Sequence, residues 1–155
     1  PPLDPAESIA AVCAELMPQA QVHQQTLEVD VTPGCTVAVT ASWLQIALRN
    51  LVDNALRYAG EGAHIQVRVA PGGAGCSFTV ADDGPGVAPA LRAQLSARFV
   101  RGEVEDEGCG LGLSIVARIA TLSNAQLELG DGLPRADGGH GFAATLRFGE
   151  VPGQP

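Results

Sequence analysis

Apolar residues recur at helical spacing in three segments of the chain. They lie three or four positions apart in residues 6–17, form one stripe in residues 42–57, and occupy nearly every side of residues 111–122. Residues three and four apart share one face of a helix, so each segment predicts a helix. The third helix has no polar face and is expected to be buried.

Local signals predict where these helices begin and end. Asp4 followed by Pro5 is typical of a helix start, and Pro18 predicts the end of that first helix. Ser42 and Gln45 have the spacing of a capping box, which predicts the start of the second helix.

Strict alternation of apolar and polar residues predicts strands elsewhere. The alternating runs cover residues 27–31, 65–69, 76–82, 125–129 and 142–148, and Val37 with Val39 indicates one more short strand. Residues 84–110 are rich in Gly, Pro and charge and read as a long loop with one short helix near 89–97. This order predicts an α/β fold, a two-layer sandwich with a mixed, largely antiparallel sheet and helices on one face.

Composition argues against several classes of function but does not identify one. A chain of 155 residues, 46% hydrophobic, suits one domain over residues 1–150 with a tail at 151–155. With 17 acidic and 9 basic residues the net charge is −8, which argues against nucleic acid and anionic membranes as partners. Four widely spaced cysteines without a C-x-x-C pair favour reduced thiols over a zinc site or disulfides.

The helix over residues 42–57 carries polar residues in line. Relative to Asn50, Asn54 lies near 40° and Arg57 near −20° at about 100° per residue, away from the apolar stripe. A solvated outer face explains Arg57 easily. It explains the two asparagines poorly, because Asn is a middling helix former.

A carboxylate ends the strand over residues 76–82. The period of two that points Phe78 and Val80 inward does the same for Asp82, and an ionised carboxylate there requires hydrogen-bond donors. The glycines Gly84 and Gly86 then break the strand. An ordinary Asp-Gly turn is the alternative at this point.

Three alternating glycines precede the buried helix. Gly108, Gly110 and Gly112 leave backbone amides uncovered at a helix N-terminus, where phosphate binds through free N–H groups and the helix dipole. A flexible hinge is the other interpretation. The run is neither a Walker loop nor the Rossmann fingerprint, since no Gly-Lys-Ser/Thr and no clear parallel βαβ unit accompany it.

In this order and spacing, the pieces resemble the ATP-binding catalytic domain of bacterial sensor histidine kinases, within the superfamily of gyrase, Hsp90, histidine kinase and MutL ATPases. Residues 50–58 resemble the N box, residues 82–86 the first glycine box, and residues 108–116 the second. Residues 98–101 resemble the F box, although Ser96 stands where an earlier Phe is usual. The resemblance covers about residues 3–148.

The resemblance implies a role for each motif. Asp82 would accept a hydrogen bond from the adenine amine, Asn54 would bind Mg²⁺, and Asn50 would orient a water or the reacting phosphate. Arg57 would reach a phosphate, which with the two asparagines makes the expected catalytic set. Residues 87–107 would form the ATP lid. The other residues expected to contact ATP are Tyr58, Gly84, Gly86, Val87, Arg101, Gly108, Gly110, Leu111, Gly112 and Leu113.

The implied function is a protein-histidine kinase catalytic domain that donates the ATP γ-phosphoryl group. None of His23, His64 and His140 has the surroundings of a phosphoacceptor, so the accepting histidine is expected on a separate domain, with a response regulator as an indirect partner. The domain itself is expected in the cytoplasm, without membrane contact, and the full-length protein in the bacterial inner membrane. The alternatives are an ATPase clamp of the same superfamily and a non-catalytic nucleotide-binding regulator.

Overall fold

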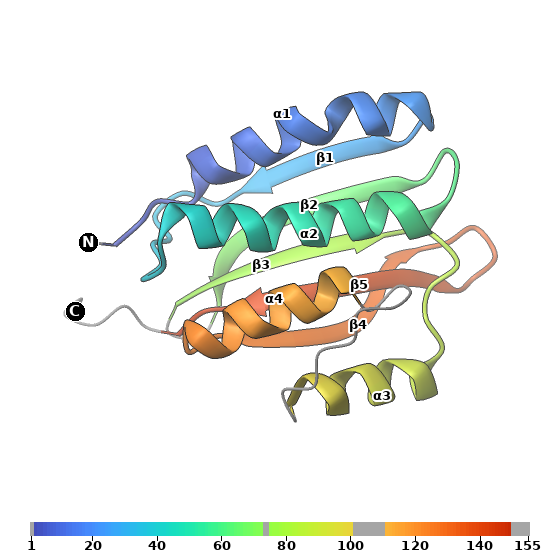
Figure 1. Ribbon diagram of the computed structural model, residues 1–155. Coiled ribbons are helices and arrows are strands. Elements are labelled where there is room, and N and C mark those ends of the chain that lie inside the picture. The colour runs from blue at the N-terminus through green and yellow to red at the C-terminus, as the bar shows by residue number, and fades with distance from the viewer. Residues whose placement is uncertain (1, 73–74, 101–110, 150–155) are drawn as a thin grey trace.

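One mixed five-stranded sheet, in the order β1-β2-β3-β5-β4, supports the domain. The computed structural model describes residues 2–72, 75–100 and 111–149 (Figure 1). The strands are β1 (Thr26–Val31), β2 (His64–Gly72), β3 (Gly75–Asp82), β4 (Gln126–Pro134) and β5 (His140–Arg147). β1 pairs with β2 in parallel, and the other neighbouring pairs are antiparallel.

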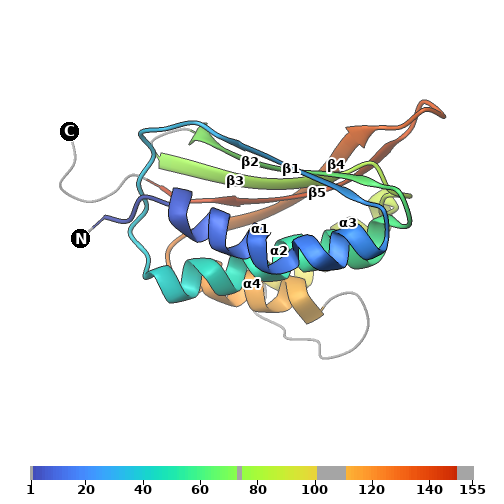
Figure 2. The same cartoon turned by 90° about the horizontal axis from the view of Figure 1, so that it is seen from above.

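Helices cover one face of this sheet and leave the other open (Figure 2). They are α1 (Ala6–Val22), α2 (Ala41–Ala59) and α4 (Leu111–Leu122), while α3 (Pro89–Val100) lies beyond β4 at the edge of the sheet (Figure 1). The core lies between the sheet and the helices α1, α2 and α4, and includes Phe78, Leu48 and Val116. The expected two-layer α/β sandwich, with a mixed and largely antiparallel sheet, is confirmed.

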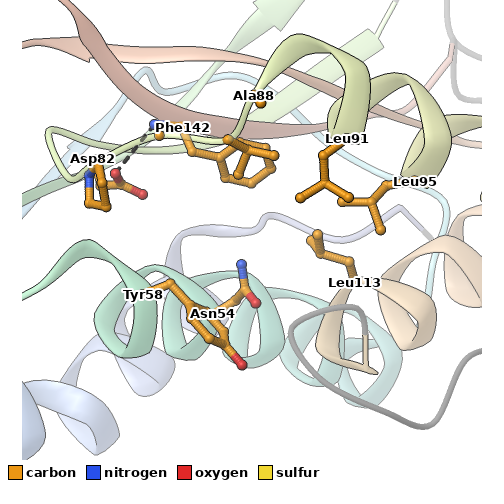
Figure 3. A pocket seen from close by; sticks show the side chains of 11 residues that line it. Asn54, Tyr58, Asp82, Ala88, Leu91, Leu95, Leu113 and Phe142 are labelled. Carbon is orange, nitrogen blue, oxygen red and sulfur yellow. Dashed lines mark hydrogen bonds between the residues drawn. The ribbon is translucent and has the colours of Figure 1, made fainter.

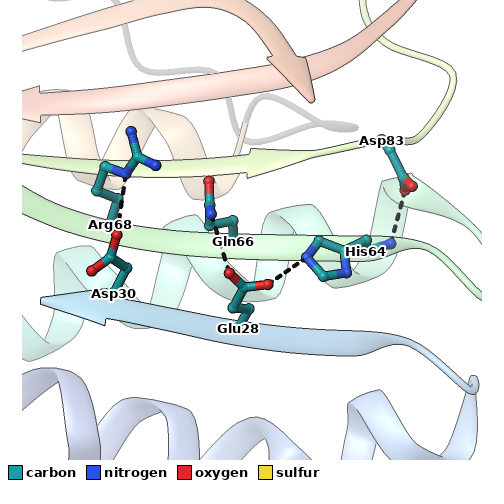
Figure 4. A network of polar contacts seen from close by, with 6 residues as sticks. All are labelled: Glu28, Asp30, His64, Gln66, Arg68 and Asp83. Atoms are coloured by element: carbon teal, nitrogen blue, oxygen red, sulfur yellow. Dashed lines mark hydrogen bonds and ion pairs between the residues drawn. The ribbon is translucent and has the colours of Figure 1, made fainter. Parts of the chain in front are cut away.

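The open face carries side chains of both charge signs. His64 pairs with Glu28 at 2.9 Å and Arg68 with Asp30 at 3.7 Å, both between β1 and β2 (Figure 4). Such exposed pairs contribute about 1 kcal/mol at most, so this face is a solvated surface. Within the described residues, no helix combines the length and the apolar character that crossing a membrane requires.

Several local expectations were wrong. Pro18 lies inside α1, because Pro18 and Ala14 both face solvent, where water can satisfy the carbonyl that loses its helical partner. Thr40, not Ser42, caps α2 by accepting a hydrogen bond from the N–H of Trp43 at 3.3 Å. Val37 forms only an isolated bridge with Leu3 instead of a strand.

The cysteines also depart from the expectation of reduced thiols. Cys35 and Cys76 form a disulfide across 41 residues, with Cα atoms 5.6 Å apart. The segment after β1 and the start of β3 meet in the core, which sequence spacing does not reveal. Cys13 is buried and free, and burial raises the pKa of its thiol.

Two glycines of the β4–β5 hairpin sit in very different surroundings. A Cβ on Gly141 would overlap the backbone carbonyl of Asp82, whereas a Cβ on Gly130 would meet no atom within 4 Å. Backbone cannot move aside as a flexible side chain does, so close packing on Asp82 requires glycine at 141.

We therefore expect Gly141→Ala to lower the free energy of unfolding by about 3 kcal/mol, and Gly130→Ala to change it by less than about 0.5 kcal/mol. Urea denaturation followed by circular dichroism measures both. Equal stabilities of the two variants would contradict the close approach of β5 to Asp82.

Candidate nucleotide-binding site

A pocket of about 310 Å³ opens at the end of α2, where the chain leaves β3 (Figure 3). Its walls come from α2, the loop after β3, α3, the first turn of α4 and the start of β5. The lining residues are Asn54, Tyr58, Asp82, Pro85, Gly86, Val87, Ala88, Leu91, Leu95, Leu113 and Phe142. Most of these are apolar, so the pocket suits a flat hydrophobic group with a few polar contacts.

Asp82 is the buried polar group of this pocket, with 5% of its surface exposed. Its Oδ1 accepts hydrogen bonds from the N–H of Gly84 at 2.9 Å and from the N–H of Phe142 at 3.3 Å. Within the described residues both bonds use Oδ1, which leaves Oδ2 for a ligand. The inward direction predicted from the period of two is confirmed by this burial.

Burial raises the pKa of the Asp82 carboxyl above its usual range. The hydrogen bonds from Gly84 and Phe142 and the charge of Arg135 act in the opposite direction, while the neighbouring charge of Asp83 adds to the rise. Because the folded state holds the proton more readily than the unfolded chain, ionised Asp82 costs stability. That cost is absent below about pH 4 and grows as the pH rises through the folded pKa.

The far wall of the pocket is the last part of α2. Asn54 and Tyr58, one turn apart, lie opposite Asp82 (Figure 3). The loop after β3 packs directly against this wall at Gly84. A Cβ on Gly84 would come within 2.6 Å of the Cα of Ala59, so only glycine permits this approach. The structure therefore brings Asn54, Tyr58, Asp82 and Gly84 together.

Asn50 and Arg57 occupy different surroundings. The side-chain amide of Asn50 donates to the carbonyl of Ile46 at 2.8 Å, and its Oδ1 would lie 3.5 Å from a Cβ at Gly112, so Asn50 faces the first turn of α4. Arg57 is 65% exposed and pairs with Asp53 at 2.9 Å. Neither lines the pocket, and their expected roles stay predictions.

The remaining expected contacts fall into three groups. Gly86, Val87 and Leu113 line the pocket. Gly86 has φ +77°, and a Cβ built on it would lie only 2.8 Å from the carbonyl oxygen of His140. Leu111 begins α4. Arg101, Gly108 and Gly110, together with the second part of the expected lid, lie outside the described residues.

Sequence reasoning missed the pocket residues contributed by α3 and β5. Phe142 was predicted only as part of the alternating strand over residues 142–148, yet its N–H donates to Asp82 because the β3–β5 register places the two strand ends side by side. Leu91 and Leu95 lie four apart, a helical spacing that could have indicated an apolar wall.

An ion pair links α3 to the sheet. Arg92 contacts the carboxylate of Asp131 on β4 at 2.8 Å, and Asp131 is 66% exposed. Leu91 and Leu95, which line the pocket, lie on either side of Arg92 in the same helix, so this contact and the burial of Leu95, 3% exposed, both place α3 against the pocket.

The comparisons with known proteins agree with this geometry. A family model described as histidine kinase-, DNA gyrase B- and HSP90-like ATPase matches residues 39–151. The chain belongs to this ATPase family. Sensor protein QseC of Salmonella typhi is 42% identical over 106 residues, which make up 68% of this chain and 22% of that protein. The swarming motility regulation sensor protein RssA of Serratia marcescens is 35% identical over 142 residues, 89% of this chain and 29% of that protein.

Solved structures of histidine kinases share the fold. The mycobacterial sensor histidine kinase MprB has a TM-score of 0.78 at 27% identity, covering 97% of this chain and 100% of that chain. The catalytic domain of histidine kinase ThkA has a TM-score of 0.81 at 17% identity, covering 98% of this chain and 97% of that chain, a likeness of fold alone. The chain is thus an ATP-binding catalytic domain of the two-component sensor kinase type, and spans about a fifth to a third of the curated relatives' length.

Removing the charge of Asp82 should not lower the stability of the kinase domain at pH 7, although it should weaken ATP binding. Asp82→Asn keeps an acceptor at Oδ1 and removes the buried charge, so we expect a melting temperature at pH 7 no lower than that of the unmodified domain. The difference in melting temperature between the two proteins should narrow as the pH falls toward about 4, because protonation removes the buried charge of Asp82. Calorimetry at several pH values measures this.

The same variant should lose adenine selectivity. Exchanging the acceptor at Oδ2 for an amide donor is expected to lower ATP affinity at least about tenfold, the scale of one hydrogen bond to a charged group, while GTP affinity changes little. Titration calorimetry with both nucleotides measures the ratio. Equal affinity of the unmodified domain for ATP and GTP would rule out Asp82 as the residue that selects adenine over guanine.

Proposed function

We propose that this kinase domain binds Mg-ATP with its adenine in the pocket and transfers the γ-phosphoryl group to a histidine on a separate phosphoacceptor domain. The observation that carries the proposal is the position of Asp82, a buried carboxylate with one oxygen facing an apolar pocket. An adenine offers the two matching properties, a flat apolar face and an exocyclic amine that donates to a carboxylate.

The phosphates are expected to extend from the base along α2 toward α4. Asn54 lines the pocket on that side, and Asn50 lies one turn earlier, against the start of α4. The amides at Gly108, Gly110 and Gly112 would bind the phosphates at the positive end of the α4 dipole. Arg57 would have to leave Asp53 to reach them, which an exposed ion pair permits at low cost.

Asn54 is a suitable ligand for Mg²⁺. The ion prefers oxygen ligands and often takes one or two from the protein, with substrate phosphates and water supplying the others. No cluster of three His, Cys, Asp or Glu residues suited to a metal occurs in the described parts of the chain, so a metal here would depend on phosphate oxygens. When bound, Mg²⁺ would neutralise charge on the transferring phosphoryl group.

A neutral amide fits this position better than an acid. A second carboxylate beside the triphosphate would repel it, whereas the Asn54 oxygen carries no net charge. The Asn50 amide cannot act as a general base on water, which disfavours a hydrolytic clamp as the function.

The phosphoacceptor is proposed to lie on a partner domain of the same receptor, with a response regulator acting after it. His23 and His64 are bound to surface carboxylates of Glu61 and Glu28. In the transfer, the bond between the γ-phosphorus and its ADP oxygen breaks, a bond to the imidazole nitrogen forms, and the imidazole proton passes to solvent. We further infer that the full-length receptor sits in the bacterial inner membrane with this domain in the cytoplasm.

The reaction is tested by adding a helical hairpin that carries a phosphoacceptor histidine of a related sensor kinase. We expect acid-labile, base-stable phosphate on the hairpin in the presence of Mg-ATP. Phosphate release without any acceptor would instead indicate an ATPase clamp, and ATP binding without either product a nucleotide-binding regulator.

The metal role of Asn54 has its own test. Asn54→Ala should leave the fold intact, since the side chain lies off the buried stripe of α2, and should lower the Mg²⁺-dependent part of ATP affinity at least about tenfold. Gln45→Ala, on the opposite side of the same helix, serves as the matched control. Titration with a non-hydrolysable ATP analogue, with and without Mg²⁺, measures the effect; equal Mg²⁺ dependence in all three proteins would exclude Asn54 as the ligand.

A further inference from the structure

Near its tip, the β4–β5 hairpin packs against the end of β3, where Asp82 lies, and against the loop that follows. A Cβ at Gly132 or at Gly141 would overlap the Asp82 carbonyl oxygen, and a Cβ at Gly86 would come within 2.8 Å of the His140 carbonyl oxygen. The hairpin and the loop are therefore packed backbone against backbone, and Asp82 and Gly86 at this contact also line the pocket.

Arg135 reaches across from this tip to the loop. Its Nη1 donates to the backbone carbonyl of Asp83 at 2.8 Å, and its Nε donates to the carboxylate of Asp137 at 3.3 Å. A tight turn fixes the position of Arg135, because its N–H donates to the carbonyl of Gly139 at 2.8 Å and its carbonyl accepts from Gly138 at 3.1 Å. Asp137 is also held, since its Oδ1 accepts from the N–H of Gly139 at 2.9 Å.

The same part of the loop is held from the other side by β2. Asp83 accepts a hydrogen bond from the N–H of His64 at 2.8 Å through its side chain and donates its own N–H to the His64 carbonyl at 3.2 Å (Figure 4). Asp83 thus lies between the first residue of β2 and the guanidinium of Arg135.

The bond from Arg135 acts on the peptide unit that binds Asp82. The carbonyl of Asp83 and the N–H of Gly84 belong to one planar peptide group. Arg135 holds the oxygen end of this group, and its nitrogen end donates to Oδ1 of Asp82 at 2.9 Å. A charged donor on the oxygen also polarises the peptide, which strengthens the N–H as a donor.

We propose that Arg135 is a positioning residue for base recognition, which acts on the Asp82 carboxylate through the peptide between Asp83 and Gly84. The inference rests on the proposed binding of ATP and adds to it a determinant outside the pocket, since Arg135 is not one of the lining residues. Its side chain is 31% exposed, so a surface arginine sets the geometry of a buried acceptor.

The test compares ATP and GTP affinities of Arg135→Met, Arg135→Lys and Arg147→Met by titration calorimetry. Arg147 is the matched control, an arginine at the other end of β5 that pairs with Glu128 at 3.0 Å on the open face. We expect Arg135→Met to lose about tenfold in ATP affinity with little change for GTP. Arg135→Lys should recover most of that loss, because an ammonium can donate to the same carbonyl, and Arg147→Met should match the unmodified domain.

The outcomes separate this inference from the function on which it rests. An unchanged ratio of ATP to GTP affinity in Arg135→Met, or equal losses in the Met and Lys variants, would overturn the positioning role while ATP binding stands. An unmodified domain that does not bind ATP would overturn the proposed function and the inference together. Should Arg135→Met fail to fold, Arg135→Gln takes its place against Arg135→Lys, with the same two criteria.

Discussion

The interaction on which the site depends is the pair of backbone hydrogen bonds to the buried carboxylate of Asp82. Burying a charge is costly unless donors surround it, and here the donors come from Gly84 in the following loop and from Phe142 on β5. Each donor must approach Asp82 closely, which in turn requires the small residues Gly132 and Gly141. A single acid thus constrains which residues can occupy the loop after β3 and the distant β4–β5 hairpin.

The pocket has the carboxylate of Asp82 at one end, apolar side chains along its interior, and the side-chain amide of Asn54 on the α2 wall. Asn54 and Tyr58 are held in place because the buried stripe of α2, from Leu44 to Ala59, fixes the rotation of the helix on the sheet. The site is therefore a consequence of how the core packs. This explains how a fold with a TM-score of 0.81 is retained at 17% identity to ThkA, since burial pattern constrains it more than residue identity does.

Periodicity was sufficient to predict the layers, the stripe of α2 and the inward direction of Asp82, because each of these follows from the spacing of residues along one element. It was insufficient where distant segments meet. The disulfide of Cys35 with Cys76, the isolated bridge of Val37 and the donation from Phe142 all depend on strand order and register, which no single element encodes. Pro18 shows a different limit, since its effect on α1 depends on which side of the helix faces water.

The two halves of the pocket differ in how firmly they are attached. Asp82, Asn54 and Phe142 belong to the sheet and to the core helix α2, whereas Leu91 and Leu95 belong to α3, which an ion pair between Arg92 and the exposed Asp131 ties to β4. A surface ion pair contributes about 1 kcal/mol or less and weakens with salt. Leu95 is 3% exposed, so detaching α3 would break this ion pair and also expose buried apolar surface. The hydrogen bonds of Asp82 to Gly84 and Phe142 do not involve α3, so the polar end of the cavity would keep its geometry while its hydrophobic side opened.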